Sequence, residues 1–412
     1  MKHKKILVIG GGAAGMMAAL SAAEEGCRVT IWERNNRLGK KLLSTGNGKC
    51  NFSNRDMGIE HYYGSDLAVA SGVLERFGVE DTVRLFGSMG MLSREKDGFL
   101  YPYSEQASTV PDILQQQLHR LHVSIETGVK AERICRLRSG LLAAQTADRQ
   151  EVFDSIILAC GGRAAPKTGS DGSGYVLAKA LGHTIITPLP ALVQLRCGEK
   201  NLKEVAGVRA KADLQLHIDG RRAASEYGEL QLTDYGISGI AVFQMSRLAS
   251  CALQRGQKVT VTANFMRGYP EKNWEEFIHQ RLLMFQDATV GQLFTGMLNY
   301  KLMQYFIKHS GLKPEQAVSK AERDRIYRVF SLCREWTLHI EAANSFDNAQ
   351  VSAGGVPFSE VTENLESCME PGVYFAGELL DIDGKCGGYN LQWAWSSGYI
   401  AGKSAAEGEH TI

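Results

Sequence analysis

Residues 5–15 have the sequence KILVIGGGAAG, and this stretch decides the fold. A short apolar run bounded by glycine predicts a buried strand at residues 5–9. Gly10, Gly12 and Gly15 then match the pattern G-x-G-x-x-G, and the alanine- and methionine-rich residues 13–25 favour a helix. A second strand is predicted at residues 28–32. Strand, helix and strand within about thirty residues predict a βαβ unit with parallel strands.

The glycine loop predicts a dinucleotide site. Gly10 permits the tight turn, Gly12 lets the backbone approach a pyrophosphate, and Gly15 lets the helix pack close to the sheet. Ala13 and Ala14 open the helix, whose first N–H groups and partial positive charge attract phosphates. We therefore expect these five residues to contact the cofactor.

Glu33 stands at the end of the second predicted strand, eighteen residues after Gly15. An acidic side chain at this place accepts hydrogen bonds from a ribose 2′-OH and repels a 2′-phosphate. The site therefore favours FAD or NAD over NADP. Arg34, the next residue, is a further candidate for cofactor binding.

Composition excludes several classes of protein. The 412 residues include 46 basic and 45 acidic ones, a net charge of +1 that gives no sign of a nucleic-acid or anionic-membrane partner. No apolar run approaches the ~20 residues of a membrane span, so we expect a cytoplasmic protein. The nine cysteines are scattered without a Cys-x-x-Cys pair, and the histidines show no metal-ligand spacing. We expect neither a disulfide framework nor a metal site.

The middle of the chain differs from its two ends. Residues 190–265 are strand-like, residues 271–329 are helical, and strand character returns from Thr337. We predict a cofactor-binding domain from residues 1–190 and 345–412. An inserted β-rich domain is predicted from residues 191–270 and 330–344, with a helical subdomain at 271–329.

Three segments favour FAD over NAD. Residues 156–162, IILACGG, resemble the strand end of FAD-binding domains, and residues 372–378, GVYFAGE, resemble their C-terminal strand motif, whose acidic residue typically meets the ribityl chain. Asp381 or Asp383 could share that role. Residues 387–392, GGYNLQ, precede a helix, and glycines there let the backbone approach a flat ring. A helix N-terminus at that ring would stabilise negative charge on its reduced form. The candidate residues in these segments are Ala159, Cys160, Gly161, Gly377, Glu378, Gly388, Tyr389, Asn390 and Leu391.

A glycine- and asparagine-rich loop at residues 38–51, LGKKLLSTGNGKCN, follows Glu33. Its backbone amides and lysines could meet the pyrophosphate and the edge of the flavin ring. The candidate cofactor-binding residues of this loop are Lys40, Lys41, Ser44, Gly46, Asn47, Cys50 and Asn51. Lys130 and Ala131, which follow a strand predicted at residues 124–126, complete the candidate set.

At this point a family resemblance is visible. The pattern Gly-Lys-Lys-x-x-x-(Ser/Thr)-Gly-x-Gly-x-Cys-Asn, with residues 169–175, 232–239, 352–356 and 377–384, resembles the BaiN-like or YhiN-like flavoproteins, also known as aminoacetone-oxidase-like. The resemblance covers nearly the whole chain. It implies an α/β fold with a Rossmann-type, glutathione-reductase-like FAD domain made from both termini, an inserted β-barrel-like domain and a helical subdomain. It also implies NAD(P)/FAD-dependent oxidoreductase activity. Cys386 departs from the threonine expected there.

The expected activity is that of a FAD-dependent oxidoreductase acting on a small organic substrate, with NADH or NADPH as a transient reductant of the flavin. There is no second G-x-G-x-x-G and no Cys-x-x-Cys, so a glutathione-reductase-type relay is not expected. The alternative is a non-catalytic flavin-binding protein whose FAD is structural or senses redox state. A third reading is an NAD dehydrogenase without flavin. We hypothesise that Cys50 or Cys386 lies near the flavin and is redox-active. No catalytic residue, substrate identity or oligomeric state is predicted.

Overall fold

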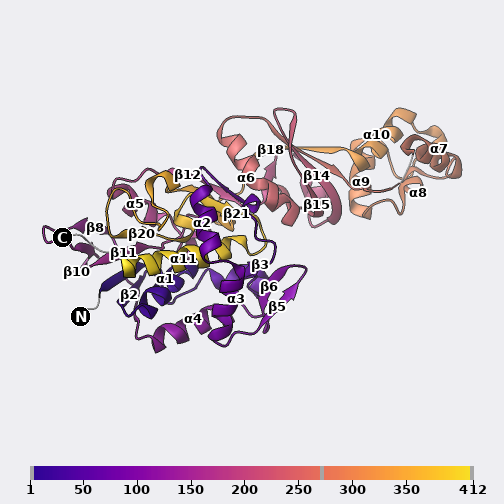
Figure 1. The fold of residues 1–412 in the computed structure, drawn as a ribbon. Helices are drawn as coiled ribbons and strands as arrows, with labels where there is room; N and C mark the ends of the chain where they lie inside the picture. The colour runs from indigo at the N-terminus through magenta and orange to yellow at the C-terminus, as the bar shows by residue number, and fades with distance from the viewer. Residues whose placement is uncertain (1–3, 270–272, 409–412) are drawn as a thin grey trace. The chain divides into compact units, whose positions relative to one another are not determined.

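The computed structural model describes residues 4–269 and 273–408, and these form two compact units. Unit 1 runs to Pro190 and resumes at Phe346, and unit 2 comprises Ala191–Ser345. Both ends of the chain therefore contribute to unit 1, and unit 2 is inserted between them (Figure 1). The boundary expected between the β-rich and helical segments, at residue 270, lies outside the described residues.

A five-stranded parallel sheet forms the centre of unit 1. Its strand order is β20 (Val373–Phe375), β11 (Ser155–Leu158), β1 (Lys5–Ile9), β2 (Arg28–Glu33) and β7 (Ser124–Thr127). β1 pairs in parallel with β11 on one side and with β2 on the other. Ile6, Leu7 and Val8 are fully buried, as expected for a central parallel strand covered on both faces. The predicted βαβ unit and Rossmann-type sheet are confirmed.

Two helices from opposite ends of the chain pack together in unit 1. α1 (Ala13–Glu24) follows the glycine loop, and α11 (Tyr389–Glu407) is the last helix (Figure 1). A Cβ at Gly398 of α11 would lie 2.4 Å from the Ala14 carbonyl oxygen, and one at Gly402 would lie 2.2 Å from that of Ala18. The absence of side chains at these two glycines allows the close approach. The C-terminal helix is thereby brought to the dinucleotide loop.

Smaller elements surround this sheet. α4 (Thr109–Arg120) also packs on α1. The remaining elements of unit 1 are β3 (Ser53–Asn54), β4 (Tyr62–Gly64), α2 (Ala68–Arg76), α3 (Val79–Ser88), β5 (Ser93–Lys96), β6 (Phe99–Pro102), β8 (Arg133–Arg136), β9 (Leu142–Gln145), β10 (Gln150–Phe153), α5 (Ser173–Ala180), β12 (Ile186–Ala191), β19 (Val351–Gly355) and β21 (Ile382–Gly384).

Unit 2 contains a closed six-stranded barrel. Its strand order is β13 (Leu195–Cys197), β16 (Gly236–Ser238), β15 (Arg221–Leu232), β14 (Arg209–Ile218), β17 (Val259–Asn264) and β18 (Trp336–Ala343). Alternate side chains fill the interior: along β17, Val259, Val261 and Ala263 are buried while the residues between them are half-exposed. The β-barrel-like insertion implied by the family resemblance is confirmed.

The expectation that residues 190–265 are strand-like is wrong at one place. Residues Ile240–Gln254 form α6, a helix that contacts β15 of the barrel. Its buried Val242, Met245 and Ala249 recur at helical spacing, a signal that the surrounding turns and strands obscured. Tertiary packing of this apolar face holds the helix in place.

The helical segment of unit 2 comprises α7 (Trp274–Met284), α8 (Val290–Phe294), α9 (Tyr300–His309) and α10 (Arg323–Arg334). α10 continues five residues beyond the predicted end at residue 329, and β18 begins at Trp336. Phe294, Phe306 and Phe330 are fully buried and form the centre of this segment. Within residues 4–269 and 273–408, no helix combines the length and apolarity needed to cross a membrane.

Candidate functional site

The N-terminus of α1 has the features of an anion site. Gly12 is its N-cap, no side chain caps the helix, and its first turn holds no acidic residue. The first amides of a helix, here those of Ala13 and Ala14, have no acceptor within the helix. A Cβ at Gly12 would meet no atom within 4 Å, so the space beside this N-cap residue is open. The geometry suits a phosphate group of a dinucleotide.

Close contacts fix the shape of this loop. Gly10 has a φ of 106°, and its N–H donates to the Trp32 carbonyl oxygen at 2.8 Å. A Cβ at Gly15 would lie 1.8 Å from the Gly10 carbonyl oxygen, and one at Gly10 would lie 2.5 Å from that of Ala159. The glycine loop, the first turn of α1 and the end of β11 therefore meet only because residues 10 and 15 are glycines. Cys160 and Gly161 follow directly at the end of β11.

Glu33 is held beside the loop by its own carboxylate. Oε2 accepts the Gly11 N–H at 2.7 Å, and Oε1 accepts both the backbone N–H and the side-chain amide of Asn35, each at 2.7 Å. The side chain is buried, with 7% of its surface exposed. Two carboxylate oxygens carry about four lone-pair sites, so acceptor capacity is left for a ribose diol.

Two further segments lie beside Glu33. Arg34 forms an ion pair with Asp171, and the Asn35 side chain donates to the Thr168 carbonyl oxygen at 3.1 Å. The segment after β7 reaches the same strand end, because the Val129 N–H donates to the Glu33 carbonyl oxygen at 3.0 Å. The next two residues are the candidates Lys130, which is exposed, and Ala131, which is buried.

The loop at residues 38–51 reaches the C-terminal half of unit 1 through Lys41. Its Nζ lies 2.8 Å from Glu378 Oε2 and forms a half-buried ion pair. Ser44 Oγ donates to the Lys41 carbonyl oxygen at 2.9 Å. Lys40 is exposed, and Gly46 and Asn47 both have positive φ values, which makes the turn. Through this ion pair, Lys41 contacts Glu378, another candidate cofactor-binding residue.

Cys50 and Asn51 face the protein interior. Cys50 is fully buried, and burial raises the pKa of its thiol to about 11. Asn51 donates through Nδ2 to the carbonyl oxygens of Ser53 and Leu100, at 2.9 and 3.0 Å. A buried, protonated thiol is inert, so the geometry argues against a redox role for Cys50. Cys386 is half-buried in the turn before α11.

Glu378 connects three segments. It follows β20 and Gly377, whose N–H donates to Ser397 Oγ of α11 at 2.9 Å. Its Oε1 accepts the Ser352 N–H at 2.6 Å, and its Oε2 pairs with Lys41. Asp381, the alternative acidic residue, is buried and accepts the Ser65 N–H at 2.8 Å instead.

The start of α11 is held rigidly. Gly388, its N-cap, has a φ of 93°, and a Cβ there would lie 2.5 Å from the backbone of Ser53. The Tyr389 carbonyl oxygen accepts the Tyr62 hydroxyl at 2.8 Å. Asn390 exchanges two hydrogen bonds of 2.8 Å with the backbone of Gly384. Leu391 is half-buried beside them. The Asn390 amide is thus used to fix the turn.

The sequence patterns missed three residues of this region. Asn35 holds Glu33, Asp171 pairs with Arg34, and Ser352 donates its backbone N–H to Glu378. Asp171 and Ser352 lie within the motifs at residues 169–175 and 352–356, which is the signal that could have found them. No motif includes Asn35, whose role depends on its hydrogen bonds to Glu33, two residues earlier in the chain.

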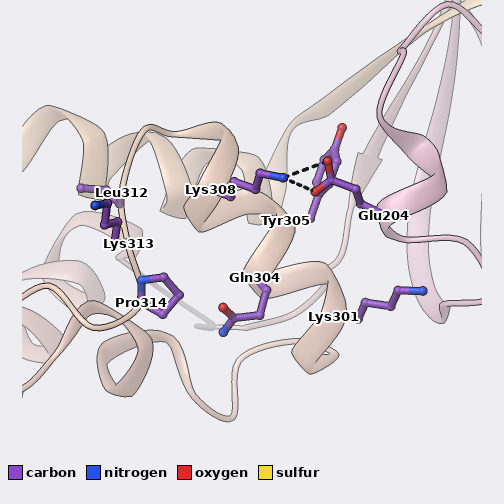
Figure 2. Close-up of a pocket in the computed structure, with 8 residues that line it drawn as sticks. All are labelled: Glu204, Lys301, Gln304, Tyr305, Lys308, Leu312, Lys313 and Pro314. Carbon is purple, nitrogen blue, oxygen red and sulfur yellow. Dashed lines mark hydrogen bonds and ion pairs between the residues drawn. The ribbon is translucent and has the colours of Figure 1, made fainter.

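Two other features carry no comparable chemistry. A cavity of about 300 Å³ in unit 2 is lined by residues of α9 and by Glu204, which binds Lys308 Nζ at 2.9 and 3.0 Å (Figure 2). Lys301 of the same cavity donates to the Ala206 carbonyl oxygen. In unit 1, Asp56, Glu60 and His61 are close enough to hold a metal, but both acidic side chains are exposed.

The fold and the arrangement of these residues define a dinucleotide-binding, Rossmann-type protein with an inserted barrel. The chain belongs to the HI0933-like family of flavoprotein oxidoreductases: the model of the HI0933-like protein Rossmann domain matches residues 4–404. It is 40% identical to the 3-dehydro-bile acid delta(4,6)-reductase of Clostridium scindens, over 98% of this chain and 99% of the relative. It is 27% identical to the ribosomal RNA dihydrouridine synthase of Haemophilus influenzae, over 98% of each chain. The Escherichia coli protein of the same name is 26% identical, over 98% of this chain and 100% of the relative.

Proposed function

We propose that this chain is a FAD-dependent oxidoreductase that reduces a carbon–carbon double bond next to a carbonyl group in a small organic substrate. The main support is the arrangement of two features. The N-terminus of α1 has no side-chain cap, and Glu33 Oε2 beside it accepts the Gly11 N–H at an N···O distance of 2.7 Å. A Cβ at Gly12 would meet no atom within 4 Å, so no protein atom obstructs a ligand beside this residue, and the acceptors of Glu33 suit a ribose. The residues present therefore fit the cofactor.

Each part of the site has a task in this proposal. FAD, when bound, supplies the two-electron chemistry. Gly10–Gly15 and the first amides of α1 bind the pyrophosphate, and Glu33 binds the adenosine ribose. Glu378 and Lys41 would hold the ribityl chain, and the N-terminus of α11 would stabilise negative charge at the ring.

The substrate class is inferred from what the relatives share. One is named as a reductase of the 4,6 double bonds of a 3-dehydro bile acid, and two are named as synthases of dihydrouridine. Both reactions saturate a ring double bond conjugated to a carbonyl group. The higher identity to the bile acid reductase supports a small-molecule substrate over RNA.

The alternative is a non-catalytic flavin binder with a structural or redox-sensing FAD. The inserted unit 2, with its complete barrel, supports an enzyme, because a structural cofactor needs no such addition. We also propose NADH or NADPH as the transient reductant of the flavin. Support for this lies in the reductase relatives, whereas no second G-x-G-x-x-G offers a separate nicotinamide domain.

The test is an anaerobic experiment on the FAD-loaded protein. NADH or NADPH is added while the visible spectrum is recorded, and a 3-oxo-4,6-diene steroid or uridine-containing ribosomal RNA follows. We expect bleaching by one nicotinamide and return of the yellow colour with the steroid, matched by loss of its double bond. Recolouring by RNA alone would overturn the small-molecule substrate. Recolouring only by oxygen would support an oxidase or sensor instead.

A further inference from the structure

Three side-chain oxygens converge on Gly162, just after β11. A Cβ at Gly162 would lie 2.9 Å from Ser352 Oγ, 3.0 Å from Glu378 Oε1 and 3.0 Å from Tyr175 Oη. The backbone of Gly162 is not in the left-handed region, so its conformation does not demand glycine. Glycine is required at residue 162 for lack of space, because any side chain there would displace the three oxygens.

Two of these oxygens already have partners, and the third has none. Ser352 Oγ accepts the Arg163 N–H at 2.8 Å, and Glu378 Oε1 accepts the Ser352 N–H at 2.6 Å. Tyr175 is 6% exposed, and its buried hydroxyl has no hydrogen-bond partner within the described chain. Ser352 lies beside the Tyr175 hydroxyl and opposes part of the rise in the pKa of the phenol, but the two side chains do not meet with the geometry of a hydrogen bond. A buried hydroxyl without a partner is rare in native proteins and calls for a ligand.

We propose that the Tyr175 hydroxyl donates a hydrogen bond to a hydroxyl oxygen of the ribityl chain of FAD, beside Glu378. This inference rests on the proposed function. A carboxylate only accepts hydrogen bonds, whereas a phenol can donate one. A ligand hydroxyl both donates and accepts, so it can donate to Glu378 and accept from Tyr175. A phosphate oxygen could not donate to Glu378 and would be repelled by its charge.

The protonation of Tyr175 supports its role as a donor. Burial, together with the negative charges of Glu378 and Asp381, raises the pKa of the phenol well above its ordinary value of 10.0. The hydroxyl therefore keeps its proton throughout the physiological pH range. Lys41, paired with the second oxygen of Glu378, keeps that carboxylate in place as the complementary acceptor.

The experiment compares two ligands on the apoprotein. FAD affinity is measured by quenching of flavin fluorescence, and ADP affinity by calorimetry, because ADP lacks the ribityl chain. For Tyr175→Phe we expect FAD binding to weaken about fivefold to tenfold, the effect of one neutral hydrogen bond, with ADP binding unchanged. Tyr374→Phe is the matched control, since Tyr374 is equally buried in unit 1 but carries its hydroxyl beside Glu366. It should bind both ligands like the wild type.

A second variant tests the space at Gly162. Gly162→Ala should weaken FAD binding more than Tyr175→Phe does, because its Cβ displaces all three oxygens, and ADP binding should again be retained. Unchanged FAD affinity in Tyr175→Phe would overturn the inference, as would an equal loss of ADP and FAD affinity. A wild-type protein that binds ADP but no FAD would refute the proposed function itself.

Discussion

Replacing Gly15 by alanine should separate α1 from the sheet and weaken cofactor binding. The new Cβ would lie 1.8 Å from the Gly10 carbonyl oxygen, whereas real Cβ atoms keep at least 3.0 Å, so the helix or the loop must move by about 1.2 Å, the difference. The obstacle is backbone, so no side-chain rotation relieves it. Overpacking of this kind costs about 1–3 kcal/mol, while alanine returns up to about 1 kcal/mol of helix propensity. We expect a net loss of about 1–2 kcal/mol in the free energy of unfolding.

The same displacement moves the amides that face the pyrophosphate. Loss of one hydrogen bond to a charged phosphate costs about 1.5–3 kcal/mol, which corresponds to about a tenfold to hundredfold weaker FAD affinity. Urea unfolding of the apoprotein and fluorescence titration with FAD measure the two effects. Gly72→Ala is the matched control, because Gly72 lies within α2 and a Cβ there would meet nothing within 4 Å. That variant should be as stable as the wild type or more so, with unchanged affinity.

The reasoning about Gly15 would be refuted by a Gly15→Ala protein that binds FAD like the wild type. Equal behaviour of Gly15→Ala and Gly72→Ala would show that the helix can shift without cost. A loss of stability with full affinity would separate packing from phosphate binding and leave the role of the first amides unsupported.

The remaining predictions concern charge and titration. Glu378→Gln should weaken FAD binding while the apoprotein keeps its stability within about 1 kcal/mol, as fluorescence titration and urea unfolding would show, since its ion pair with Lys41 is partly exposed to solvent and the glutamine oxygen can still accept the Ser352 N–H. Burial lowers the pKa of His183 below its ordinary 6.5, opposed by the Glu360 hydrogen bond. The unfolded chain therefore takes up this proton first, and unfolding by urea should become easier as pH falls below about 6.5; a His183→Gln variant should lose that part of the pH dependence. Cys50, with its pKa near 11, should resist thiol reagents at neutral pH while exposed Cys368 reacts, as mass spectrometry after brief labelling would report. Rapid modification of Cys50 would contradict its burial.

Local signals predicted the frame of the fold. The apolar run before Gly10 and the glycine spacing placed β1 and α1 almost to the residue, because strand burial, turn geometry and helix propensity all agree there. The family motifs predicted the barrel, which no single turn signal could. α6 was missed although its buried residues recur at helical spacing, because the strands and turns on either side of it obscured that signal.

The candidate site was less accessible from sequence. Glu33 and Glu378 were expected at strand ends, but the partners of Glu378, Ser352 and Lys41, come from other segments of the chain. Cys50 stands in a loop whose composition suggested cofactor contact, yet its side chain is fully buried, because a short polar loop can still turn one residue into the core. Side-chain direction depends on the packed structure, which spacing alone does not determine.

FAD binding by the purified wild-type chain tests the central claim most directly. We predict a yellow protein that binds one FAD per chain, with a flavin spectrum shifted from that of free FAD. Removal of the flavin and titration with FAD should restore that spectrum. A colourless protein that takes up no FAD and binds NAD tightly would contradict the account and support an NAD dehydrogenase instead.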